Sequence, residues 1–259
     1  MTEMFSKHFH REKPCHPDQP AGSAQPIQSR VEGPFVLKRH LLLLLTAAAL
    51  AYLPTLSLAA DQATITFTLD FPHSNPDHYS LQVQSDGHAH YESRARISPD
   101  SEDTDNYQTD FAFSDATRAR IFDLAQQAHY FSGKIDSGKK KLAFTGAKKL
   151  IYKDADHNNT AEYNYSLIPS VEQLTALFQS VGATLEFGRR LTYFHHYQKL
   201  ALNDELKSME DEARTGEITE LQAVKPILQA IYDDPSVMNV VRGRAHRLME
   251  MNPSISAGK

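Results

Sequence analysis

The chain has 259 residues, of which 41% are hydrophobic and 23% charged, and its formal net charge is −5. Six basic and four acidic residues precede Leu41, so the rest carries 21 basic against 28 acidic residues, a balance that argues against nucleic acid or an anionic lipid surface as the main partner. The single cysteine is Cys15, which excludes disulfides, thiol catalysis, thiolate zinc sites and cysteine lipidation for residues 61–259.

Residues 1–40 contain five prolines among polar residues and show no hydrophobic period. Such a segment cannot bury a core, so we expect it to be disordered. It is also long for the leading region of a signal peptide, and a downstream start at Val31 or Val36 is an alternative interpretation.

Residues 41–60 begin with five leucines after a basic flank and run without a charge to Asp61. A basic flank, a short apolar core and a small-residue exit are typical of a secretory signal peptide, here with cleavage after Ala59 or Ala60. The alternative is an uncleaved membrane anchor, although Pro54 leaves the apolar run short for a span. Both interpretations predict export to the periplasm, the cell envelope or the medium, with membrane contact only through residues 41–60 if they are retained.

The exported part opens with alternating patterns typical of half-buried strands. We expect strands over 63–71, 79–83, 88–97 and 107–113, the second and third joined by a tight turn at Asp86-Gly87. In the third strand Ala89, Tyr91 and Ser93 share one face and are predicted to point to the core.

Helices are expected to alternate with these strand groups. Ser114 is a good N-cap for a helix ending near His129, and Ser170 with Gln173 forms a capping box for a helix through Leu185. Between them, residues 148–153 and 160–165 read as a second hairpin. The pattern predicts an α+β domain over 61–187, an antiparallel sheet with helices on one face.

From Gly188 onward the pattern is helical only, which predicts a small all-helical bundle over 188–252 and a disordered tail over 253–259. A capping box at Thr219 is expected to open a helix that bends at Pro226, and Ser236 is expected to cap the last helix.

Residues 221–248 combine an apolar helix carrying a proline, an Asp-Pro turn and a second helix with Val240-Val241-Arg242 and Ala245. This segment resembles a single HEAT-type helical unit, which implies a protein-binding surface. The chain as a whole resembles bacterial exported proteins of unknown function, a family that implies no chemistry.

Two histidines of the third strand form the candidate metal site. Because His88 and His90 are two residues apart, both leave the same face and could hold a metal with a third ligand from His73, His78 or Asp86. The same face continues with charged residues, which favours an ordinary solvated surface, and no cofactor is expected.

Asp154, Asp156 and Asn158 have the spacing of the first three oxygen ligands of a calcium loop. The glycine and the bidentate glutamate that such a loop needs are replaced by Asn159 and Tyr165. We therefore interpret the segment as a polar hairpin turn.

The basic residues of the exported part are concentrated between positions 134 and 149. Lys139, Lys140, Lys141, Lys148 and Lys149 form the candidate patch for docking an anion or an acidic partner, with a solvated loop as the simpler interpretation.

Arg189, Arg190, His195 and His196 lie on the predicted helix that leaves the sheet, and a structural role is expected for them. The sequence contains no nucleophile elbow, no zinc-protease motif and no phosphate loop. The leading expectation is therefore an exported, non-enzymatic interaction module that binds an unknown envelope or extracellular protein, with the helical part as the docking surface. The alternative is an exported metal-binding protein or hydrolase that uses His88 and His90.

Overall fold

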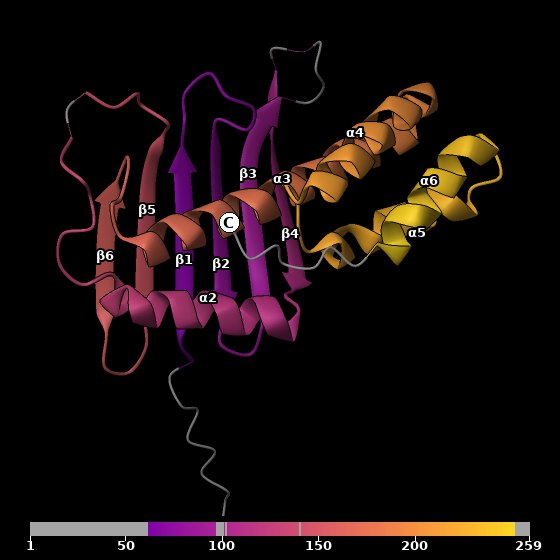
Figure 1. Ribbon diagram of the computed structural model, residues 1–259. Helices are drawn as coiled ribbons and strands as arrows, with labels where there is room; N and C mark the ends of the chain where they lie inside the picture. The colour runs from indigo at the N-terminus through magenta and orange to yellow at the C-terminus, as the bar shows by residue number, and fades with distance from the viewer. Residues whose placement is uncertain (1–61, 97–100, 102, 140, 252–259) are drawn as a thin grey trace, which may run out of the picture. The chain divides into compact units, whose positions relative to one another are not determined.

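The computed structural model describes residues 62–96, 101, 103–139 and 141–251 (Figure 1). The chain divides into two units, Met1–Ser57 and Leu58–Lys259, and every described residue belongs to the second. The predictions for residues 1–40, the segment 41–60 with its cleavage positions Ala59 and Ala60, and the tail 253–259 lie outside the described residues. None of the helices in the described part of the chain combines the length and the apolar composition that a membrane span requires.

The sheet is antiparallel throughout, in the order β4-β3-β2-β1-β5-β6. The first four strands form a meander, and the β5–β6 hairpin joins it on the free side of β1. The strands are β1 (Thr64–Asp70), β2 (His78–Gln84), β3 (His88–Arg96), β4 (Thr104–Ala112), β5 (Ala147–Lys153) and β6 (Asn158–Tyr163).

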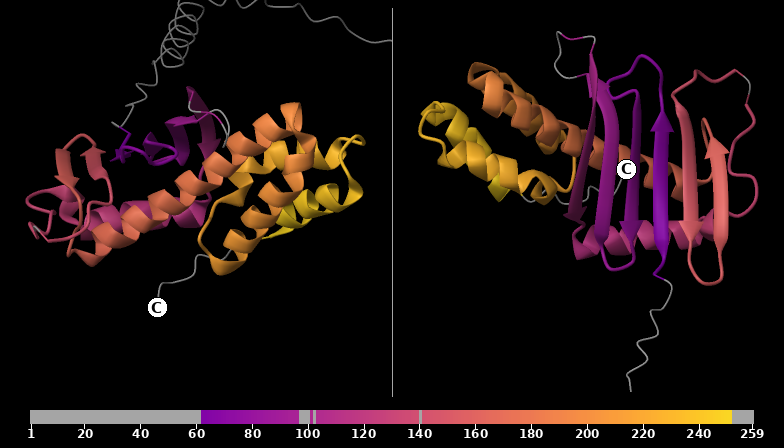
Figure 2. Two further views of the ribbon diagram at one scale, coloured as in Figure 1. Left: turned by 90° about the horizontal axis from the view of Figure 1, so that it is seen from above. Right: turned by 180° about the vertical axis from the view of Figure 1, so that it is seen from behind.

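The helices of the described residues include two that cross the same face of this sheet, α2 (Asp115–Gln127) and the long α3 (Pro169–Tyr197), as Figures 1 and 2 show. The predicted fold class, an antiparallel sheet with helices on one face followed by further helices, is confirmed. The remaining helical elements are η1 (His129–Phe131), η2 (Lys199–Ala201), α4 (Leu202–Thr215), η3 (Leu221–Val224), α5 (Lys225–Asp233) and α6 (Asn239–Glu250).

The core lies between the sheet and its two helices. Strict alternation buries Ile65, Phe67 and Leu69 of β1 on the helix side, and Phe67 stacks on Phe178 of α3 with ring centroids 5.3 Å apart. Gly182 allows this close packing, because a Cβ there would lie 3.2 Å from the ring of Tyr79.

A buried glutamate joins α3 to the sheet. Glu186 accepts hydrogen bonds from the hydroxyls of Tyr91 (3.0 Å) and Ser93 (2.6 Å), and Arg189 donates to its other oxygen (2.8 Å). Arg189 also donates to the carbonyl of Arg96 at the end of β3. α3 then continues through the boundary expected at residues 187 and 188, so one helix contributes to the sheet core and to the packing of the C-terminal helices.

Two predicted helix starts are wrong, and a proline accounts for each. α3 begins at Pro169 rather than at a cap on Ser170, and Pro226 lies in the first turn of α5 instead of bending a longer helix. The fixed φ of proline suits a first helical turn, where its missing N–H costs nothing. Residues 221–224, expected in the same helix, form the separate 3₁₀ turn η3.

Of the two other expected N-caps, one is confirmed and one is wrong. Ser114 caps α2 as predicted, with its hydroxyl accepting from the N–H of Thr117. Ser236 does not cap α6, which begins at Asn239, because both its N–H and its hydroxyl donate to Asp234.

Candidate binding site on the open face of the sheet

The right-hand view of Figure 2 shows the face of the sheet opposite α2 and α3, and no helix of the described residues covers it. The residues on this face are mostly polar. The strand register places its side chains in rows that cross the sheet, because residues directly opposite one another share a face. One row is Asn106, Arg94, His78, Asp70 and Ala147, and the next is Gln108, Glu92, Ser80, Thr68, Lys149 and Glu162.

Two neighbouring hollows occupy these rows. The larger, of about 600 Å³, lies over β1, β5 and β6, and the smaller, of about 440 Å³, lies over β3 and β4. Both are open to solvent, and His78 of β2 lines both. We call the pair the open-face trough; its larger part has a volume in the range of ligand sites.

Polar side-chain pairs between neighbouring strands line the larger hollow. Nδ1 of His78 lies 2.6 Å from Oδ1 of Asp70, so the carboxylate orients the imidazole ring. Lys149 Nζ lies 3.2 Å from Glu162, and both charges of this ion pair are solvent-accessible. The larger hollow therefore presents hydrogen-bond donors and acceptors side by side, and the charges of Lys149 and Glu162 compensate one another.

Phe144 forms the rim of the larger hollow. Its side chain is 56% exposed, and its ring packs edge-on against Phe71 with centroids 5.9 Å apart.

The backbone on both sides of Phe144 is held by one side chain. The amide of Asn164 donates to the carbonyl of Ala143 (3.1 Å) and accepts from the N–H of Thr145 (3.0 Å). Asn164 follows β6 directly, so the end of the hairpin fixes the loop that precedes β5.

The buried side chain of Lys148 holds the same loop through hydrogen bonds. Its side chain is 6% exposed, and its ammonium donates to the carbonyl (3.1 Å) and hydroxyl (2.9 Å) of Thr145 and to the carbonyl of Asn164 (3.0 Å). Burial lowers the pKa of Lys148, although these acceptors satisfy the charged form. Gly146, with φ +96°, lets the loop pass β1, where a Cβ would lie 2.6 Å from Leu69 Cδ1.

The predicted basic patch is therefore divided. Lys148 does not belong to an exposed patch, because it is buried and bonded to the loop, and Lys149 pairs with Glu162. Lys139 and Lys141 are exposed, and Lys140 lies outside the described residues.

The predicted histidine pair lies on the same open face, as expected for alternate residues of β3. His88 is exposed, whereas Nδ1 of His90 lies 2.6 Å from Oδ1 of Asp110 on β4. Asp86, a possible third ligand, accepts from the backbone N–H of His88. Within the residues that the structure describes, no group of three or more His, Cys, Asp or Glu side chains is arranged to hold a metal ion.

The segment compared with a calcium loop forms the turn of the β5–β6 hairpin, as interpreted from the sequence. Oδ1 of Asp154 accepts from the backbone N–H groups of Asp156 (2.8 Å) and His157 (2.6 Å), which closes the turn.

Arg190 and His195 of α3, and Lys199 of η2, contact the helical elements that follow them. Arg190 pairs with Glu205 of α4 (2.6 Å), while His195 and Lys199 both contact Asp234 between α5 and α6 (2.9 and 2.6 Å).

Sequence reasoning missed Phe144, Asn164 and the trough. Phe144 lies outside every periodic segment, and the amide contacts of Asn164 depend on a fold in which residues about twenty positions apart meet. The residues next to Phe144 carry no periodic pattern, and only Gly146, which precedes an alternating strand, indicates a close approach of the backbone.

No model of a known protein family matches the chain, and the search of curated proteins finds no relative of it.

Proposed function

We propose that this chain is an exported, non-enzymatic binding protein that holds a polar partner in the open-face trough. The observation that carries the proposal is the fixed exposure of Phe144 over a hollow lined with hydrogen-bonding side chains. Asn164, Lys148 and Gly146 restrain the loop in the free protein, and such preorganisation reduces the entropy lost when a partner binds.

The proposal that the protein is exported is based on the sequence of residues 41–60. The test is the mature N-terminus of the full chain expressed in a secreting bacterium, measured by mass spectrometry. A chain that starts at Ala60 or Asp61 in the exported fraction supports the proposal, and an intact leader on cytosolic protein contradicts it.

Binding through the trough can be tested by photo-crosslinking in the intact cell. A benzophenone side chain replaces Phe144 in one variant and Leu200 of η2, which is 82% exposed, in the other. We expect an adduct of defined mass at position 144 that disappears when Thr68, on the floor of the trough, is changed to Arg. An adduct only at position 200, or none at either position, would refute the proposal.

The helical part is the second candidate surface, as the HEAT-type resemblance implies. Tyr197, Leu200, Met238 and Val240 are its exposed apolar side chains, and Lys199 links the two segments that carry them by contacting Asp234 and Ser236. An adduct at position 200 would favour this surface.

A metal-dependent function remains the competing proposal, with His88 and His90 as ligands. The metal content of purified protein tests it: stoichiometric zinc or copper that is lost in the His88→Ala, His90→Ala double variant would support it.

A further inference from the structure

We propose that the ligand of the open-face trough is a neutral oligosaccharide; this inference rests on the proposed function and names its ligand class. Three properties favour such a ligand: the pairing of charged side chains in the larger hollow, the exposed ring at its rim and the extent of the trough across the sheet.

The pairing of charged side chains within the larger hollow disfavours a strongly charged ligand there. In the larger hollow Asp70 is paired with His78 and Glu162 with Lys149, and the buried ammonium of Lys148 is directed to loop oxygens. A charged ligand would have to break one of these pairs, whereas a hydroxyl can donate to a carboxylate and accept from an ammonium without separating them.

The polar groups suit vicinal hydroxyls in particular. Lys149, whose Nζ lies 3.2 Å from Glu162, has further N–H groups to donate beside that carboxylate, while Nδ1 of His78 is already engaged with Oδ1 of Asp70 at 2.6 Å, which leaves Oδ2 of Asp70 and Nε2 of His78 for a ligand. Two adjacent hydroxyl groups can engage such a pair together. The hydroxyl of Thr68 lies between the pairs in the register.

Phe144 supplies the apolar component. A sugar ring has a face of C–H groups, which packs on the electron-rich face of an aromatic ring. The ring lines the larger hollow and is held edge-on by Phe71, so one aromatic face is available to a ligand at the rim.

The extent of the trough favours an oligomer. The two hollows together touch β1 to β6 and share His78 in their common wall. Six neighbouring strands span about 24 Å, which is longer than one sugar ring. Asn106, Gln108 and Arg94 continue the polar lining at the far end, and Arg94 is itself paired with Asp77 (2.9 and 3.0 Å).

The inference is tested by titrating the isotope-labelled mature protein, residues 61–259, with neutral hexasaccharides of glucose, N-acetylglucosamine and xylose, and recording amide and ring resonances. We expect saturable shifts for Thr68, His78 and Thr145 with at least one of the three, and at least a tenfold loss of affinity in Phe144→Ala. Leu167→Ala, which removes another exposed apolar side chain, should leave the affinity unchanged.

Thr68→Arg provides a second variant, because it adds a long side chain to the hollow from β1 and leaves Asn164, Lys148 and Gly146, which hold the Phe144 loop, unchanged; it should abolish binding. Absence of shifts with all three sugars, or shifts that persist in both variants, overturns the inference. If the crosslink at position 144 then identifies a protein, the proposed function stands and the ligand class is wrong; if neither experiment finds a ligand at the trough, both fail.

Discussion

The side-chain amide of Asn164 brackets Phe144, binding the carbonyl of the residue before it and the N–H of the residue after it. An exposed ring is thus fixed by a residue twenty positions further along the chain. Under the proposed function this bracket lowers the entropic cost of binding, because a ring on a flexible loop would lose more freedom when a partner binds.

Asn164→Ala should release the loop while leaving the sheet intact. We expect a loss of about 1–2 kcal/mol in the free energy of unfolding, because two hydrogen bonds to backbone groups disappear. The N–H of Thr145 should exchange with solvent much faster. Asn158→Ala, at the exposed start of the same strand, is the control and should change neither quantity. Unchanged exchange at Thr145 would show that Asn164 does not hold the loop.

Gly146→Ala should destabilise the protein more than Gly133→Ala. Both glycines have positive φ, +96° and +81°, but a Cβ at 146 meets Leu69 Cδ1 at 2.6 Å, while one at 133 meets nothing within 4 Å. The φ strain alone costs about 1 kcal/mol, and the clash should add about 1–3 kcal/mol. Urea unfolding of the two variants measures the difference, and equal losses would mean that the loop shifts freely away from β1.

His129→Gly should give a more stable protein than His129→Ala. His129, Tyr130 and Phe131 are three consecutive non-glycine residues with φ of 51°, 53° and 63°, a left-handed turn that is costly for residues with a Cβ. His129 is exposed, so little packing is lost on its removal. We expect His129→Gly to be about 1 kcal/mol more stable than His129→Ala. Thermal unfolding of the two variants measures this difference. An alanine variant at least as stable as the glycine variant would show that the positive φ at position 129 causes no strain.

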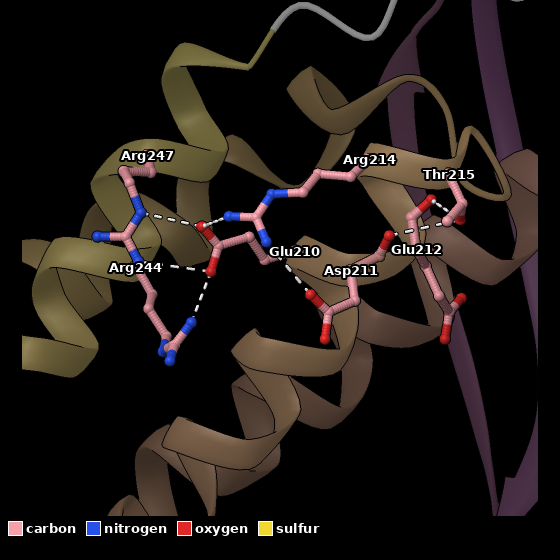
Figure 3. A network of polar contacts seen from close by, with 7 residues as sticks. All are labelled: Glu210, Asp211, Glu212, Arg214, Thr215, Arg244 and Arg247. Atoms are coloured by element: carbon pink, nitrogen blue, oxygen red, sulfur yellow. Dashed lines mark hydrogen bonds and ion pairs between the residues drawn. The ribbon is translucent and has the colours of Figure 1, made fainter.

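Glu210 should make the free energy of unfolding depend on pH in the acidic range. Its carboxylate, 1% exposed, receives hydrogen bonds from Arg214 (2.6 Å), Arg244 (2.6 Å) and Arg247 (2.9 Å), as Figure 3 shows. The hydrogen bond from Arg247, with the nearby positive charges, lowers the pKa of Glu210 below its ordinary value of 4.5. The unfolded chain then binds the proton more readily. The contribution of Glu210 is therefore complete above pH 4.5 and is lost as the pH falls through the folded-state pKa.

Unfolding free energies measured between about pH 3 and 6 test this dependence. Glu210→Gln should lower stability near neutral pH by about 3 kcal/mol, as expected when a buried ion pair loses one partner, and should flatten the acid limb. Asp211→Asn, which removes the exposed partner of Arg214, should cost less than about 0.5 kcal/mol. If the free energy of unfolding of Glu210→Gln falls with decreasing pH as steeply as that of the unchanged protein, other groups cause the pH dependence.

The strands and hairpins could be predicted from the sequence because their signal is local. Alternation placed Tyr91 and Ser93 on the buried face, and Ser114 marked the start of α2. The order of the strands could not be predicted, since the pairing of β1 with β5 joins segments about eighty residues apart.

Two local patterns each allow more than one interpretation. Lys148 belongs to a basic run in the sequence, but alternation within β5 turns it inward, where it donates hydrogen bonds to loop carbonyls. The apolar spacing that continues through η3 predicts a bend at Pro226, although proline is equally suited to the first turn of a helix.

Hydroxyl-radical footprinting of the exported protein in intact cells, compared with the purified protein, tests the open face as the binding surface most directly. The account predicts that Phe144 and His78 are protected in the cell, while Tyr197 and Met238 on the helices are modified equally in both samples. Protection of Tyr197 and Met238 with full modification of Phe144 and His78 would contradict it.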